Sequence, residues 1–248
     1  MKRILLLTPF FTLLLTLAFV TDSAAQKSKA RSIVGRGDVI TAKRKTGDFA
    51  GIDVKGNFDI IVTFGKRPEM RIEAYENLEE NIVTDVQENM LLIGPYRSFT
   101  SDTPVKIYLT VNRLEQIRAK GGAVITIEEN LTKANTNAEA LIMDIRSGAK
   151  VDITLDSLAA KAKLFENGQL YLKGNTPNLI AEVEGNSVLA AGELAAERVW
   201  LRARSGSSAK IIADKELDVA VSEGATVFYR GRPDLKQEIS SGGKLRRL

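Results

Sequence analysis

A short glycine-containing corner recurs through the second half of the chain. Its copies are Lys120-Gly121-Gly122-Ala123, Arg146-Ser147-Gly148-Ala149, Glu166-Asn167-Gly168-Gln169, Glu184-Gly185-Asn186-Ser187, Arg204-Ser205-Gly206-Ser207, Ser222-Glu223-Gly224-Ala225 and Ser240-Ser241-Gly242-Gly243. The sequence number rises by 26, 20, 17, 21, 18 and 18 through Gly122, Gly148, Gly168, Gly185, Gly206, Gly224 and Gly242. Self-similarity at such a period is typical of repeat architectures. We therefore predict that these seven glycines mark structural corners.

Alternating apolar residues lead into the corners. Leu141, Met143 and Ile145 precede Gly148, and a similar alternation precedes Gly206. A period of two places such residues on one face of a β-strand, and glycine accepts the positive φ of a tight corner. One coil of about 20 residues cannot bury its apolar face alone, whereas stacked coils pair their backbones and share a core. We predict an all-β solenoid of such coils, with a β-sandwich of many short strands as the alternative.

A second signature supports the same period. Tyr171-Leu172-Lys173-Gly174 leads to Pro177-Asn178-Leu179, and Phe228-Tyr229-Arg230-Gly231 leads to Pro233-Asp234-Leu235. The separation between Gly174 and Gly231 equals three turns of the repeat, within the variation seen among the corners.

The N-terminal segment has the pattern of an export signal. A short basic start and an apolar run over residues 4–20 are followed by the small residues Ser23 and Ala25. This order predicts a secretory signal peptide over residues 1–25, cleaved between Ala25 and Gln26. The alternative is a retained membrane anchor, because the apolar run approaches the length that spans a bilayer. No later segment is long and apolar enough to do so. We expect an exported protein, in the periplasm or on the outer cell surface.

The remaining chain divides into two regions. Residues 26–48 are polar and rich in Lys, Arg, Ser and Gly, which predicts a flexible leader with one short strand. Residues 49–248 form the predicted solenoid domain. Its N-terminal part is rich in strand patterns but lacks the regular corners, so we expect it to be less regular than the rest.

Missing residue types exclude several classes of site. The chain contains no Cys and no His, which excludes a Ser-His-Asp triad, a cysteine nucleophile and a His-Cys zinc site. We predict no cofactor and no metal. The net charge of +4 is spread along the chain, so nucleic acid is not an expected partner. The residue types that are present leave two kinds of enzyme open. One is a glycosidase that uses two carboxylates, and the other is a Ca²⁺-assisted polysaccharide lyase, which is suggested by analogy of fold alone.

Residues two positions before each corner glycine are expected to stack on successive coils. This column contains Lys120, Arg146, Glu166, Val183, Arg204, Ser222 and Ser240. The opposite charges of Arg146 and Glu166 predict an ion pair between neighbouring coils, which at a surface is worth about 0–1 kcal/mol.

Trp200 and Tyr229 fall where side chains face outward or are partly buried. No three carboxylates share a phase, so we predict no catalytic residues.

Several longer stretches resemble a known protein family. They are Phe49-Ala50-Gly51-Ile52-Asp53-Val54, Phe58-Asp59-Ile60-Ile61-Val62, Ile72-Glu73-Ala74-Tyr75-Glu76-Asn77-Leu78 and Ile107-Tyr108-Leu109-Thr110, followed by the Ser-Gly-Ala/Ser corners. With these residues, nearly the whole mature chain resembles the secreted Bacteroidetes family of putative auto-transporter adhesins with a head GIN domain. The resemblance implies a single-stranded, right-handed parallel β-helix, and it supplies no catalytic residues.

These observations favour a non-enzymatic, extracytoplasmic binding or adhesin-like module. Its expected partner is a protein or a glycan at the cell envelope. Two alternatives belong to other classes: a carbohydrate-active β-helix enzyme, and an envelope scaffold that forms homo-oligomers through unprotected coil ends.

Overall fold

The computed structural model describes residues 32–156 and 158–248, which form an all-β unit. Among these residues only a four-residue helix, α1 (Glu76–Glu79), and a 3-10 turn, η1 (Lys133–Asn135), interrupt the strands. No helix in these ranges is long and apolar enough to cross a membrane.

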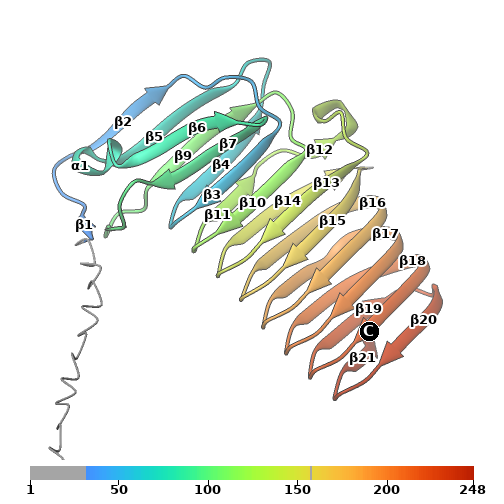
Figure 1. Ribbon diagram of the computed structural model, residues 1–248. Helices are drawn as coiled ribbons and strands as arrows, with labels where there is room; N and C mark the ends of the chain where they lie inside the picture. Colours follow the sequence, from blue (N-terminus) through green and yellow to red (C-terminus); the bar gives the residue numbers. More distant parts are fainter. Residues whose placement is uncertain (1–31, 157) are drawn as a thin grey trace, which may run out of the picture. The chain divides into compact units, whose positions relative to one another are not determined.

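Most strands belong to two long ladders (Figure 1). The first ladder runs, in spatial order, through β6 (Ile82–Gln87), β7 (Met90–Pro95), β3 (Gly51–Lys55), β10 (Gln116–Lys120), β13 (Ala140–Ile145), β15 (Ala159–Leu164), the C-terminal halves of β16 (Gln169–Val183), β17 (Val188–Ala203) and β18 (Ser208–Val221), and β20 (Asp234–Ile239). The second runs through β2 (Val39–Arg44), β5 (Glu69–Tyr75), β9 (Lys106–Val111), β4 (Asp59–Phe64), β11 (Val124–Ile127), β14 (Lys150–Asp156), the N-terminal halves of β16, β17 and β18, β19 (Thr226–Arg230) and β21 (Lys244–Arg247). Two short strands pair elsewhere: β12 (Leu131–Thr132) with β14, and β1 (Ile33–Val34) with β8 (Phe99–Thr100).

Neighbouring strands are parallel in both ladders, except where β2, β5 and β6 pair antiparallel at one end. From β10 onward, and also between β3 and β4, a corner joins a strand of the first ladder to a strand of the second, and we call such a unit a rung, named by its two strands. Each strand pairs with the strand one repeat later in the sequence. For example, Ile145 pairs with Leu164, and Leu164 in turn pairs with Val183. This parallel pairing rules out a sandwich of antiparallel hairpins.

The rungs do not follow chain order near the N-terminus. The β3–β4 rung comes first in the sequence, yet β3 lies between β7 and β10, and β4 lies between β9 and β11. After β4 the chain forms β5, α1 and β6 at the end of the ladders, returns through β7 and β9, and then passes to β10. From β10 onward the rungs are sequential. The antiparallel strands cover the end of the parallel ladders, which would otherwise expose unpaired edges.

The predicted leader contains more paired structure than expected. Its range, 26–48, includes two strands in its described part, because β1 pairs with β8 and β2 pairs along its whole length with β5. Arg44, at the end of β2, forms a 2.7 Å ion pair with Glu79. The predicted cleavage site between Ala25 and Gln26 lies outside the described residues.

Alternation along each strand builds a single core between the ladders. One inward row, in register across successive rungs, contains Ile52, Ile117, Met143, Ala162, Ala181, Leu201 and Val219. Each of these side chains is at most 3% exposed. Complete burial of a large apolar side chain contributes roughly 1.5–3 kcal/mol to stability, so these rows hold neighbouring rungs together.

The corners are tight turns with two consecutive left-handed residues. In one of them the Ala149 N–H donates to the Arg146 carbonyl at 3.2 Å, while Ser147 and Gly148 have φ of 53° and 76°. This is a type I′ arrangement. The second left-handed residue of each corner is, in order, Gly122, Gly148, Asn167, Asn186, Gly206, Gly224 or Gly242. Through this series the sequence number rises by 26, 19, 19, 20, 18 and 18, so the turns recur more evenly than the glycines.

Two predicted corner glycines occupy other turn positions. Gly185 is the first left-handed residue of its corner, and Asn186 is the second. Gly168 comes directly after Asn167, at the position where five other corners place a buried Ala or Ser and the last corner places Gly243. A Cβ at Gly168 would lie less than 3 Å from the Ile145 carbonyl oxygen, so close packing requires glycine there. Asn tolerates the left-handed backbone region. In these two corners Asn therefore occupies the second left-handed position, and the glycine lies one position before or after it.

Candidate functional site

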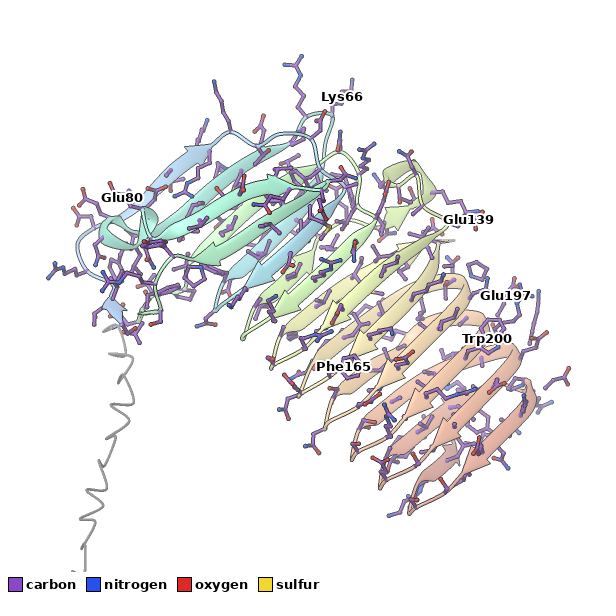
Figure 2. The ribbon with its side chains drawn as sticks, in the orientation of Figure 1. Lys66, Glu80, Glu139, Phe165, Glu197 and Trp200 are labelled. Atoms are coloured by element: carbon purple, nitrogen blue, oxygen red, sulfur yellow. The ribbon has the colours of Figure 1, made fainter. Side chains whose placement is uncertain are left out.

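A groove lies beside residues 133–139, which connect β12 to β13. Its volume of about 790 Å³ is within the range of small-molecule sites. This connection forms the wall, and the outward side of β15, β16 and β17 forms the floor. Figure 2 shows Glu139 of the wall and Trp200 of the floor on the same side of the ladders, away from Phe165 near the corners.

The wall exists because one repeat is longer than the others. The step from Gly122 to Gly148 exceeds every other step between corner glycines. The additional residues form β12, η1 and the segment that follows. A capping box fixes the start of η1: Thr132 Oγ1 accepts from the Ala134 N–H, and Asn135 Oδ1 accepts from the Thr132 N–H, both at 3.2 Å. The irregular step was the sequence signal for this wall, although it did not identify a site.

An apolar row crosses the floor. Ile142, Lys161, Ile180 and Trp200 stand in register on successive strands of the first ladder. Ile142 is 46% exposed and Ile180 is 41% exposed, while Trp200 is half-buried and lines the groove. Since strand residues alternate between two faces, this row points away from the core and these side chains do not hold the fold together. Lys161 separates Ile142 from the other two, and Ile142 lies outside the groove lining, so the adjacent pair Ile180 and Trp200 forms the apolar part of the floor. Adjacent exposed apolar side chains of this kind mark binding surfaces.

The groove carries an excess of positive charge. Lys133, Lys161 and Arg198 line it, and none of the three forms an ion pair within the described part of the chain. Arg198 Nε donates to Asn178 Oδ1 on the neighbouring rung at 3.0 Å, which orients the guanidinium group. Among the lining residues described, Glu139 is the one carboxylate. The four charged side chains sum to +2.

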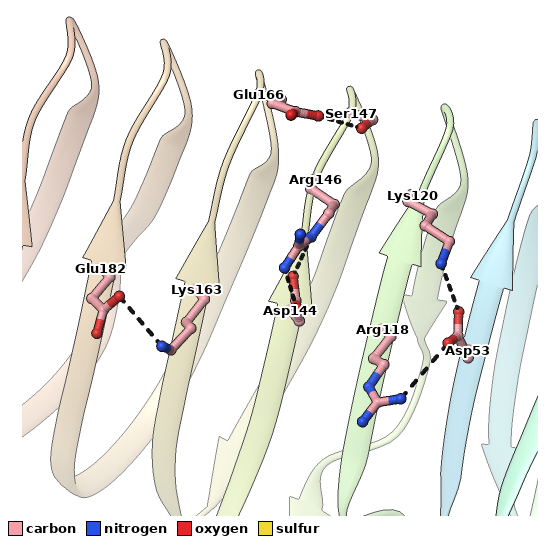
Figure 3. A network of polar contacts seen from close by, with 9 residues as sticks. All are labelled: Asp53, Arg118, Lys120, Asp144, Arg146, Ser147, Lys163, Glu166 and Glu182. Atoms are coloured by element: carbon pink, nitrogen blue, oxygen red, sulfur yellow. Dashed lines mark hydrogen bonds and ion pairs between the residues drawn. The ribbon is translucent and has the colours of Figure 1, made fainter.

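The next outward row, closer to the corners, alternates in charge. It contains, in register, Asp53, Arg118, Asp144, Lys163, Glu182 and Arg202. Figure 3 shows the first five of these side chains. Lys163 Nζ lies 3.4 Å from Glu182 Oε2. Arg202 donates to Asp218 at 2.8 Å, and this hydrogen bond is the main cause that lowers the pKa of the Asp218 carboxyl. Cations of this row therefore have carboxylates within ion-pair distance, whereas those of the groove have none among the described residues, although Arg198 stands in register with Glu216 on the next rung.

The predicted ion pair between Arg146 and Glu166 is wrong in its partners. Arg146 instead forms a 2.5 Å ion pair with Asp144, two residues earlier in the chain, and the hydrogen bond between them raises the pKa of the Arg146 guanidinium. The Arg146 guanidinium carbon also lies 5.4 Å from the centre of the Phe165 ring. Glu166 accepts a 2.6 Å hydrogen bond from the Ser147 hydroxyl (Figure 3). The left-handed backbone of Glu166 turns it onto the corner, where it meets Ser147.

The side chains that line the groove determine which chemistry it offers. Glycoside hydrolysis requires two carboxylates on either side of the bond; the described lining of this groove supplies Glu139, and the adjoining hollow supplies Glu197 and Asp214. No group of three or more acidic side chains among the described residues is placed to hold a metal ion. What the groove offers is an aromatic face, two hydrogen-bonding amides (Asn137 and Asn178) and three cationic side chains. Of these, the sequence indicated Trp200 only.

Comparison with known families gives one match. A family model described as putative auto-transporter adhesin, head GIN domain, matches residues 48–233. A search of curated proteins gave no match.

Solved structures resemble this fold closely. A crystal structure of a putative adhesin from Bacteroides fragilis NCTC 9343 superposes with a TM-score of 0.78 at 22% identity, covering 88% of this chain and 100% of its own. A putative lipid binding protein from Parabacteroides distasonis ATCC 8503 gives 0.67 at 18% identity, with the same coverage. A putative adhesin from Parabacteroides merdae ATCC 43184 gives 0.63 at 19% identity, again over 88% and 100%. At these identities the likeness shows a shared fold.

Proposed function

Since the chain belongs to the putative auto-transporter adhesin, head GIN domain family, we propose that it is an extracytoplasmic, adhesin-like binding module without catalytic activity. The observation that carries this proposal is the groove beside residues 133–139, which combines exposed apolar side chains with unpaired cations. Its partner is a protein or a glycan of the cell envelope.

The same proposal includes the finer architecture and the location. The sequential parallel rungs from β10 onward support a right-handed parallel β-helix, which provides a rigid floor for the groove. The basic, apolar and small-residue pattern of residues 1–25 supports export, with cleavage between Ala25 and Gln26. The exported protein then lies in the periplasm or on the outer surface.

Binding to envelope material tests this function. The protein is expressed from the full chain, purified in the form the cell releases, and incubated with isolated bacterial envelopes and with an array of glycans. We expect retention on envelopes that a groove variant, Trp200→Ala, weakens and that a variant of the alternating row, Lys163→Gln, leaves unchanged. Equal retention by both variants would show that the groove is not the binding surface.

A polysaccharide lyase or hydrolase is the enzyme alternative. It predicts that acidic polysaccharides become shorter on incubation with the protein, with calcium required for a lyase. Chain shortening, measured by size-exclusion chromatography with and without a chelator, would overturn the non-catalytic proposal.

A self-associating scaffold is favoured by a separate observation. Every residue of β20 is exposed, and among the described strands β20 pairs with β18 alone. Leu235 and Ile239, on this strand, are 40% and 46% exposed. A concentration-dependent oligomer in sedimentation, abolished by Ile239→Lys and formed without any envelope binding, would favour the scaffold.

A further inference from the structure

We propose that the groove binds an acidic saccharide, meaning a glycan that carries carboxylate, sulfate or phosphate groups. This inference rests on the proposed function as a binding module and adds the chemical class of its ligand. It follows from three features of the groove: the apolar row, the unpaired cations and the continuation of the groove past Pro177.

The apolar row matches one face of a sugar ring. Ile180 and Trp200 are neighbours in register, and both line the groove from its floor. A pyranose ring presents C–H groups on its face and hydroxyl groups around its rim. A flat apolar surface bordered by hydrogen-bonding groups complements that shape. Here Asn178 and Asn137 supply the bordering amides.

The unpaired cations select an acidic sugar over a neutral one. Lys161 stands between Ile142 and Ile180 in the apolar row, so a charged substituent on a stacked ring would lie near its ammonium group. Arg198 is already oriented through Nε by Asn178, which leaves its terminal nitrogens to bind an anion. Charge-assisted hydrogen bonds of this type are stronger than neutral ones.

The contrast with the alternating row shows that this charge is local. Two positions along the same strand from Lys161, the ammonium of Lys163 pairs with Glu182 at 3.4 Å. Arg202, two positions beyond Trp200, pairs with Asp218 at 2.8 Å. The first ladder therefore neutralises its cations near the corners and leaves those of the groove for a ligand.

The groove continues past one sugar unit. A second hollow of about 420 Å³ shares Lys133 and Pro177 with the first. It also contains Glu197, which is neutralised by Lys215 at 2.8 Å, and this contact lowers the pKa of the Glu197 carboxyl. Its other carboxylate, Asp214, forms no ion pair within the described part of the chain, so the excess of positive charge is confined to the first hollow. The combined length of the two hollows fits an oligosaccharide whose acidic group lies in the first hollow, beside Lys161 and Arg198, and whose neutral units extend past Pro177.

Calorimetric titration of the purified protein tests the inference. The probes are oligogalacturonate, a sulfated heparin-type oligosaccharide and a phosphorylated mannan fragment, each beside a neutral oligosaccharide of the same length. Phosphatidylglycerol vesicles form a separate arm for a lipid source of negative charge. We expect at least one acidic probe to bind about tenfold more tightly than its neutral counterpart, and more weakly as the salt concentration is raised, because screening weakens interactions between exposed charges.

Single substitutions then assign the contacts. Trp200→Ala is expected to weaken binding about tenfold. Lys161→Gln and Arg198→Gln remove the preference for the acidic probe, whereas the matched control Lys163→Gln changes nothing. Circular dichroism and the thermal midpoint of each variant establish that it remains folded.

Several outcomes would overturn the inference. They are equal affinity for acidic and neutral probes, binding to vesicles alone, and binding that is unchanged by Trp200→Ala and Lys161→Gln. Failure of every probe while the protein still binds envelopes would also reject the acidic saccharide and leave the proposed function standing. Loss of envelope binding as well would reject both.

Discussion

Gly174 and Gly231 illustrate how single residues set the spacing between rungs. Their φ values are 97° and 115°, in the left-handed region. A Cβ on Gly174 would lie less than 3 Å from the Leu155 carbonyl oxygen, and one on Gly231 would lie equally close to the Ala213 carbonyl oxygen. Both oxygens belong to the preceding rung, so the repeated sequence signature reflects the same close approach of backbones at two places.

Replacing Gly174 by Ala should therefore destabilise the protein strongly. We expect a loss of about 2–4 kcal/mol, because the left-handed backbone and the clash with a carbonyl oxygen add. The matched control is Gly148→Ala, where φ is 76° but the space is open, so only about 1 kcal/mol is expected. Urea unfolding of both variants measures the difference, and equal costs would mean that the close approach at Gly174 is not tight.

Asp218 provides a pH-dependent contribution to stability. Its pKa is lowered mainly by the hydrogen bond from Arg202, with Lys236 adding a second contact at 3.4 Å. A carboxyl whose folded pKa is lowered stabilises the fold above its unfolded pKa, and that stabilisation is lost as pH falls through the folded value. Asp218→Asn should thus cost on the order of 0.5 kcal/mol at pH 6, and the cost should shrink as the pH falls below the ordinary pKa of an aspartate. A cost that stays constant across urea midpoints from pH 6 to pH 2 would contradict this.

At the scale of elements, the alternating row fixes how neighbouring strands align. Each charge from Asp53 to Arg202 faces an opposite charge on the next strand in register. Like charges placed directly opposite each other on neighbouring strands are destabilising, whereas opposite charges contribute about 0.2–1 kcal/mol. If a strand paired with the strand two rungs away instead of with its neighbour, like charges would stand next to each other. The row therefore disfavours incorrect pairing between similar repeats.

Reversing one charge of this row tests its contribution. Lys163→Glu places three acidic side chains next to one another, with Asp144 and Glu182 as the neighbours. We expect it to destabilise the protein by about 1 kcal/mol at low salt and by less at roughly 1 M NaCl, because screening weakens surface charge interactions. Lys163→Gln, which only removes the charge, should cost less. Thermal midpoints at the two salt concentrations would refute the idea if the reversed variant showed no salt dependence.

For the molecule as a whole, stability should vary from rung to rung. Rungs from β13–β14 to the middle of β18 are paired on both sides in each ladder, and their inward residues are buried. Within the described residues, β20 and β21 are paired on one side only. Stability in stacked repeats is approximately a sum of nearest-neighbour terms, so a rung with one neighbour opens most easily.

Hydrogen exchange measured by mass spectrometry would reveal this gradient. Peptides covering residues 234–247 should exchange at least about tenfold faster than peptides covering residues 169–183, because local opening of the last rung exposes little buried surface. Uniform protection across these peptides would mean that the ladders open as one cooperative unit.

Much of the molecule follows from local patterns in the sequence. Alternation such as Leu141, Met143 and Ile145 identified strands and their inward faces, and the corner motifs identified the turns, because strand periodicity and left-handed turn residues are local properties. At two corners the predicted glycine is one position away from the second left-handed residue, because Asn167 and Asn186 adopt the left-handed backbone there in place of glycine. The family match over residues 48–233 agrees with the resemblance carried by the same motifs.

Only the tertiary structure decided the order of the first rungs and the composition of the groove. The position of β3 between β7 and β10 depends on pairing between strands far apart in the sequence, which periodicity cannot specify. In the same way, Lys161, Ile180 and Arg198 come together from three different rungs beside the longer connection at residues 133–139. Spacing along a chain defines each strand, whereas a binding surface made of several strands depends on their register in space.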